Sequence, residues 1–151
     1  MSGSAQRTVH AHWDEGMRAV VEAGRFDVVS DEPLSAGGSD TGPTPTDLFL
    51  ASIASCFVLA LVWAARRAGH ELPGLQVRVV GTYAGPRFSR VEIEVSSDAS
   101  GAVVDDLLPE AERVCYVTNS LRNPPEVHVE RVAMSTPSPR NARSADGGRS
   151  P

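Results

Sequence analysis

One segment of this 151-residue chain restricts its possible folds more than any other. From Leu48 to Ala65 there are 18 consecutive residues without a charged side chain. Residues that cap helices stand on both sides of the segment, namely Thr44, Pro45, Asp47 and Gly69. The pattern predicts one long helix from Pro45 to about Ala68, with an interior that is almost entirely apolar.

The apolarity of this helix limits its surroundings. A run of about 18 apolar residues is the shortest that crosses a membrane as a helix, but here eight of the 18 are alanine, serine or cysteine, which favours a helix inside a protein. A helix that is apolar on all sides must be buried on all sides. A monomer of this size could not enclose it alone. We therefore expect sheets or a second subunit to wrap around the helix, in an obligate oligomer outside the membrane.

The composition excludes several classes of function. The chain has 19 acidic and 14 basic residues, and every basic residue is an arginine, so Schiff-base and P-loop lysine chemistry are impossible. No dense basic run is present, which argues against nucleic-acid binding. His10 and His12 share a strand face, but no other ligand stands at metal-site spacing, so no metal is expected. The start of the chain has no apolar stretch long enough for a signal peptide, which predicts a cytoplasmic protein.

The remaining elements predict one α+β domain over residues 8–133, between a flexible start (1–7) and a disordered tail (134–151). Alternation of apolar and polar residues predicts six strands, at 9–13, 17–22, 26–29, 75–83, 88–96 and 126–130. Residues 31–43 have the composition of a loop. A second helical region is expected from Gly101 to Thr118, divided at Pro109 because proline lacks the N–H that a helix needs. Trp13 and Trp63 are expected in the core.

The two cysteines, Cys56 and Cys115, are the first candidates for chemistry. They are too few for a disulfide scaffold, and they lack the CxxC spacing of a zinc site. In a reducing compartment they are either two inert core residues, which composition alone favours, or a redox pair. Cys56 shares a face of the long helix with Ser52 and Phe49. It is too far from the helix start for help from the helix dipole, so a thiolate there would need an arginine beside it.

Two motifs resemble the OsmC/Ohr family of small bacterial hydroperoxide-reducing proteins: GPTPTDLFLASIASC, which ends at Cys56, and AERVCYVTNSL, which contains Cys115. The order of elements also agrees over about residues 9–132. The resemblance implies an α+β fold in which two chains intertwine, with the long helices between antiparallel sheets from both subunits. It implies a peroxidase of alkyl or fatty acid hydroperoxides that needs no cofactor. Cys56 would become a sulfenic acid and Cys115 would resolve it as a disulfide, which a lipoylated or thioredoxin-like dithiol protein would reduce.

The resemblance also implies an activating arginine in the amino-terminal strands. Arg18 is the best match, and Arg25 is the alternative. Many peroxidases of the family pair this arginine with a glutamate ten residues before the first cysteine, where this chain has Thr46. The difference places the chain nearer the broad OsmC-like branch, with a second possible function: a non-catalytic protein that binds a small apolar ligand at the dimer interface. With either function, Thr46, Phe49 and Ser52 are the expected pocket residues.

Overall fold

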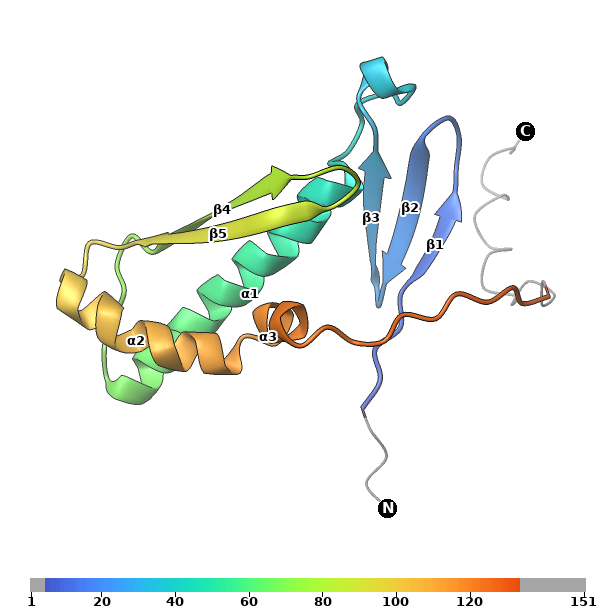
Figure 1. Cartoon of the computed structure of the whole chain (residues 1–151). Helices are drawn as coiled ribbons and strands as arrows, with labels where there is room; N and C mark the ends of the chain where they lie inside the picture. The colour runs from blue at the N-terminus through green and yellow to red at the C-terminus, as the bar shows by residue number, and fades with distance from the viewer. Residues whose placement is uncertain (1–4, 134–151) are drawn as a thin grey trace, which may run out of the picture.

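The structure, a computed structural model, describes residues 5–133 and has a mixed α and β architecture with antiparallel sheets (Figure 1). The predicted tail, residues 134–151, lies outside the described residues. In chain order the elements are β1 (His10–Trp13), β2 (Arg18–Ala23), β3 (Phe26–Asp31), the 3-10 helix η1 (Leu34–Ala36), α1 (Pro45–Ala68), β4 (Gln76–Tyr83), β5 (Phe88–Ser96), α2 (Gly101–Val114) and α3 (Tyr116–Arg122). The α+β fold class predicted from the sequence is confirmed.

The long helix α1 begins and ends where its capping residues predict. At its start, the Thr44 hydroxyl accepts a hydrogen bond from the Asp47 N–H, while the Asp47 carboxylate accepts one from the Thr44 N–H. Pro45 occupies the first helical position, where its missing N–H costs nothing. At its end, Gly69 adopts a left-handed conformation with φ of 73° and caps the last turn. Local sequence therefore sets the length of the helix that carries Cys56.

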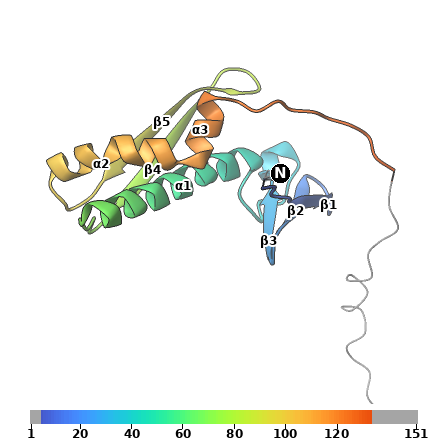
Figure 2. The ribbon, with the colours of Figure 1, turned by 90° about the horizontal axis from the view of Figure 1, so that it is seen from below.

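Two antiparallel sheets contact α1 at different places. Strands β1, β2 and β3 form one sheet, and β4 pairs with β5 in the other. The β4–β5 hairpin runs along α1, and α2 lies alongside the carboxy-terminal half of the same helix (Figures 1 and 2). The three-stranded sheet stands beyond the amino-terminal end of α1 (Figure 1). One side of α1 therefore lies against the chain's own core.

The core lies between α1, α2 and the hairpin. Its buried members come from the two helices and from Cys115: Phe57, Ala60, Leu61, Ala64, Ala65, Leu107, Ala111 and Cys115. Half of them are alanine, which lets α1 and α2 approach closely. Ile93 and Val95 of β5 pack against this cluster, while Glu92 and Glu94, which alternate with them, are exposed. This packing, and not a local motif, holds Cys115 against α1.

The burial expected for α1 and the tryptophans differs from what the structure shows. Leu59 and Trp63 of α1 are 67% and 40% exposed, so the chain covers the helix on one side and leaves an apolar face open. Arg67 covers part of Trp63, with its guanidinium 4.9 Å from the ring centre. Trp13 is 74% exposed and donates only to the Gly16 carbonyl, at 3.0 Å. The prediction of two core tryptophans is wrong, because apolarity in the sequence does not distinguish a core from a surface that a single chain leaves open.

Two predicted boundaries are also wrong. The second helical region does divide in two, but at Cys115 and not at Pro109. Helix α2 continues through the proline because Leu107 and Ala111, on either side of it, are held in the core. The strand expected at 126–130 is absent from the described chain: these residues are extended outward and exposed, and no strand pairs with them. An isolated extended segment has no partner for its N–H and C=O groups.

Candidate functional site

The structure brings together the two cysteines, which are 59 positions apart in sequence. Cys56 lies in the middle of α1, and Cys115 lies between α2 and α3. Both are free thiols, and they lie close enough for each to shift the pKa of the other. Two neighbouring cysteines can form a disulfide where their Cα atoms lie within about 7 Å of each other. The fold therefore brings together two thiols that are distant in sequence.

The protein treats the two thiols differently. Burial raises the pKa of Cys56; the N–H groups of Val117 and Tyr116 act in the opposite direction, but the neighbouring Cys115 raises it further. Burial also raises the pKa of Cys115, but the Thr118 hydroxyl and N–H groups and the Cys56 thiol outweigh burial, so this pKa is lowered. Within the single chain, Cys115 is therefore the more acidic of the two thiols.

A rigid bend between α2 and α3 positions Cys115. We call residues 113–119 the elbow. The Cys115 backbone is extended, with φ of −75° and ψ of 103°, and its N–H donates to the Ala111 carbonyl at 3.0 Å. The Thr118 hydroxyl donates to the Cys115 carbonyl at 3.2 Å, and the Asn119 side chain donates to the Arg113 carbonyl at 2.9 Å. These bonds fix the direction in which the Cys115 sulfur points.

A cavity of about 460 Å³ opens beside Cys56, and we call it the thiol pocket. Apart from the thiol, its lining is apolar or aromatic, with residues from α1 and from the elbow: Cys56, Leu59, Ala60, Trp63, Val114 and Tyr116. Cys115 is fully buried behind Cys56 and does not line the cavity. A ligand in the thiol pocket therefore meets the sulfur of Cys56 and not that of Cys115.

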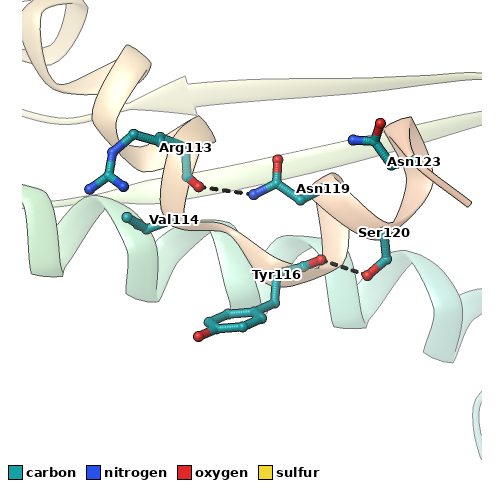
Figure 3. Close-up of a pocket in the computed structure, with 6 residues that line it drawn as sticks. All are labelled: Arg113, Val114, Tyr116, Asn119, Ser120 and Asn123. Carbon is teal, nitrogen blue, oxygen red and sulfur yellow. Dashed lines mark hydrogen bonds between the residues drawn. The ribbon is translucent and has the colours of Figure 1, made fainter. Parts of the chain in front are cut away.

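A second cavity, the elbow pocket, lies on the elbow and α3 (Figure 3). It measures about 550 Å³ and is mostly lined by polar side chains, with the residues Arg113, Val114, Tyr116, Asn119, Ser120 and Asn123. Val114 and Tyr116 also line the thiol pocket, so the two cavities are neighbours. Sequence reasoning missed this pocket, although the motif that marks Cys115 contains three of its polar residues.

Neither of the predicted arginines lies at Cys56 within the single chain. Arg18 begins β2 in the sheet beyond the amino end of α1 (Figure 1), and its Nε stands 3.4 Å from the Asp14 carboxylate. The two groups do not meet the geometry of a hydrogen bond, so within residues 5–133 the buried Arg18 Nε has no hydrogen-bond acceptor. Arg25 lies over the ring of Phe26, at 4.8 Å. Within residues 5–133, no arginine is among the groups that shift the pKa of Cys56.

The predicted pocket residues Thr46 and Phe49 lie apart from Cys56, at the start of α1. They line a separate cavity of about 350 Å³, which also includes Tyr83 and Phe88. Thr46 accepts a hydrogen bond from the Tyr83 hydroxyl at 2.9 Å, and Phe49 stacks on Phe88 with ring centres 5.7 Å apart. The third predicted residue, Ser52, is exposed and donates to the Phe49 carbonyl at 2.6 Å. Within residues 5–133, these three residues therefore do not line the thiol pocket.

Asp31, at the end of β3, has a structural role that sequence reasoning missed. Its buried carboxylate accepts hydrogen bonds from the N–H groups of Glu32, Ser39 and Thr41 and from the Thr41 hydroxyl. Burial raises the pKa of Asp31, but these hydrogen bonds together outweigh burial and lower it. An aspartate at the edge of a Gly- and Ser-rich loop was the available signal. The carboxylate therefore holds the loop between β3 and α1 in its folded conformation.

The chain is similar to known proteins in both sequence and fold. Residues 37–130 match the family of OsmC-like proteins. No curated protein matches the chain. Among solved structures, a putative osmotic stress induced and detoxification response protein from Psychrobacter arcticus is 21% identical, with a TM-score of 0.66, over 80% of this chain and 91% of that one.

Two more solved structures share the fold. An OsmC-like protein from Mycoplasma pneumoniae is 16% identical, with a TM-score of 0.67, over 80% of this chain and 90% of that one. A putative organic hydroperoxide resistance protein from Vibrio cholerae, with captopril bound in one of its active sites, is 24% identical with a TM-score of 0.63, over 82% and 90% of the two chains. At these identities the likeness establishes the fold alone.

Proposed function

The chain belongs to the family of OsmC-like proteins, and from this premise we propose that it is a thiol peroxidase that reduces organic hydroperoxides in defence against oxidative stress. One observation carries the proposal: two free thiols lie close enough to shift each other's pKa, and Cys56 lines an apolar cavity while Cys115 does not. Structural neighbours that are named organic hydroperoxide resistance proteins support the same reading.

The geometry gives each cysteine a role. The Cys56 thiolate attacks the terminal oxygen of the hydroperoxide, the O–O bond breaks, and the alkoxide takes a proton to leave as an alcohol. Cys56 is then a sulfenic acid. The Cys115 thiolate attacks the Cys56 sulfur, a disulfide forms, and hydroxide leaves and is protonated to water. A dithiol protein, lipoylated or thioredoxin-like, reduces the disulfide by exchange and becomes oxidised itself.

The accessibility of the two sulfurs supports this order of events. Cys56 is half-buried and lines the thiol pocket, whereas Cys115 is shielded behind it. The leucine and aromatic walls of the pocket suit an alkyl or fatty acyl chain better than hydrogen peroxide. The chemistry requires free thiols between turnovers, which a reducing compartment such as the cytoplasm provides.

Activation of Cys56 calls for a second subunit in this proposal. Burial raises the pKa of Cys56, so it needs a cation to become the attacking thiolate. Arg18 is the favoured source and Arg25 the alternative, each reaching the thiol across a homodimer interface. The buried Nε of Arg18 without an acceptor supports this choice, as does the open apolar face of α1 at Leu59 and Trp63. The Thr46 hydroxyl, already bonded to Tyr83, carries no charge that would hold the arginine away from sulfur.

The test is a thiol count. Reduced protein is mixed with one equivalent of an alkyl hydroperoxide, and free thiols are measured over time. We expect the wild type to lose both thiols, Cys115→Ser to give a trappable sulfenic acid, and Cys56→Ser to remain unreactive. Wild-type protein that keeps both thiols for many minutes would contradict the proposal.

A second function is favoured by one observation, the cavity at the start of α1. Its walls are aromatic, and Thr46 there replaces the glutamate found in many peroxidases of the family. A non-catalytic protein could bind a small apolar ligand at this place. Binding of a fluorescent fatty acid by protein whose thiols do not react with hydroperoxide would support this alternative, and the thiol count above distinguishes the two functions.

A further inference from the structure

The thiol pocket and the elbow pocket form an apolar and a polar compartment side by side. Val114 and Tyr116 line both cavities. Figure 3 shows the amides of Asn119 and Asn123 on one side of α3 and the Tyr116 ring on the other. A molecule that extends past Tyr116 would therefore have one end at the Cys56 sulfur and the other among polar side chains.

The elbow pocket offers hydrogen-bonding groups that the protein itself does not use. Within residues 5–133 the Asn123 side chain has no hydrogen-bond partner, so its amide presents both a donor and an acceptor. Asn119 uses its NH₂ group on the Arg113 carbonyl and leaves its side-chain oxygen as an acceptor. Ser120 donates to the Tyr116 carbonyl and keeps its lone pairs. These groups suit a ligand that both donates and accepts.

The charge of the elbow pocket is balanced locally. Arg113 is its only charged lining residue, and its Nε and Nη2 atoms each donate to the Glu110 carboxylate at 2.7 Å. Nearby, Arg122 is similarly paired with Glu112, at 3.1 Å. The Glu110 carboxylate already neutralises the guanidinium charge and would repel a ligand carboxylate, which would also face the acceptor oxygen of Asn119. An uncharged polar group meets neither obstacle.

We propose that the elbow pocket binds an uncharged polar end group, a hydroxyl or a primary amide, of an amphipathic hydroperoxide whose apolar body fills the thiol pocket. The inference rests on the proposed peroxidase function and narrows its substrate class. Asn123 becomes a specificity-determining residue, because its free amide can pair with both the donor and the acceptor of such a group. Free acids and plain alkyl hydroperoxides of the same length are poorer substrates.

The test compares three hydroperoxides of equal chain length that end in an amide, a carboxylate or a methyl group. We expect kcat/KM to be highest for the amide, by about tenfold over the methyl end, which corresponds to one or two net hydrogen bonds. Asn123→Leu should remove this preference, because the amide-ended substrate loses its hydrogen-bonding partner. Gln76→Leu, an equivalent change at an exposed position of β4, is the matched control and should behave as wild type.

A binding measurement makes the inference independent of turnover. The corresponding alcohols, which lack the peroxide, are titrated against the protein while the fluorescence of Trp63 in the thiol pocket is followed in a Trp13→Phe background. The amide-ended alcohol should bind about tenfold more tightly than the methyl-ended one, and Asn123→Leu should abolish the difference. Equal affinities in the wild type, or a carboxylate that binds best, would overturn the inference even if hydroperoxides are reduced. Loss of peroxidase activity with retained amide preference would refute the proposed function alone.

Discussion

The two faces of α1 predict two different costs for the same substitution. Leu61 is completely buried among Phe57, Leu107 and the core alanines, whereas Leu59, two residues earlier, is 67% exposed. A leucine-to-alanine change in a well-packed core costs about 3 to 5 kcal/mol, because the transfer free energy is lost and a cavity remains. Around Leu61 the cavity cannot close easily, since many members of the surrounding cluster are alanines, whose short side chains cannot move into the space.

The cost at Leu59 follows from its exposure. Full burial of a leucine is worth about 1.5 to 3 kcal/mol, so a side chain that is one-third buried contributes about 0.5 to 1 kcal/mol. Because both variants remove the same atoms from the same helix, differences in helix propensity cancel. Leu61→Ala should therefore be less stable than Leu59→Ala by about 2 to 4 kcal/mol in the single folded chain.

Urea unfolding followed by circular dichroism measures both costs. The measurement should be repeated over a range of protein concentrations, because a second subunit that covers Leu59 would make its contribution increase with concentration. The cost at Leu61 should not change in this way. The reasoning fails if Leu59→Ala destabilises a protein that sediments as a monomer as strongly as Leu61→Ala does.

Three further predictions concern single side chains. The pKa of Asp31 is lowered in the folded protein, so its ionised carboxylate stabilises the fold above the ordinary carboxyl pKa, near pH 4. This stabilisation is lost as the pH falls through the lowered pKa. Asp31→Asn should therefore weaken the acid dependence of the melting temperature. Gly38→Ala should lower the melting temperature at every pH, since a Cβ there would collide with the Glu32 carbonyl; an unchanged value would mean that the loop adapts. In a Cys56→Ser background, Thr118→Val should raise the pKa of Cys115, because the hydroxyl that lowers this pKa is gone. The pKa is measured from the ultraviolet absorbance of the thiolate. An unaltered titration would assign the lowering to the backbone alone.

Much of the fold can be predicted from the sequence wherever short-range signals determine it. Thr44, Asp47 and Gly69 fix both ends of α1, and the alternation of Val91, Ile93 and Val95 fixes which face of β5 packs inward. These features depend on neighbours in the chain. The sequence alone does not determine whether the two thiols lie close together, since that depends on how closely α1 and α2 pack.

The features that sequence reasoning got wrong depend on distant or absent partners. Proline at position 109 is a strong local signal, yet core packing on either side keeps the helix intact and moves the break to Cys115. Residues 126–130 have the alternating pattern of a strand, but they pair with no strand of the described chain. Trp63 is apolar like a core residue, and only the third dimension shows that it stands on the open face of α1.

The shielding of Cys115 also determines the direction in which a disulfide of this pair would be opened. A thiolate from an incoming reductant can approach only the sulfur of Cys56, because the sulfur of Cys115 is covered. The mixed disulfide would therefore always form on Cys56, with Cys115 as the leaving group. Thiol exchange is faster when the leaving thiol has a low pKa, and the same Thr118 and N–H contacts that lower the pKa of Cys115 would speed its departure. In the proposed cycle, one buried position would thus protect Cys115 from peroxide and favour its release when the reductant arrives.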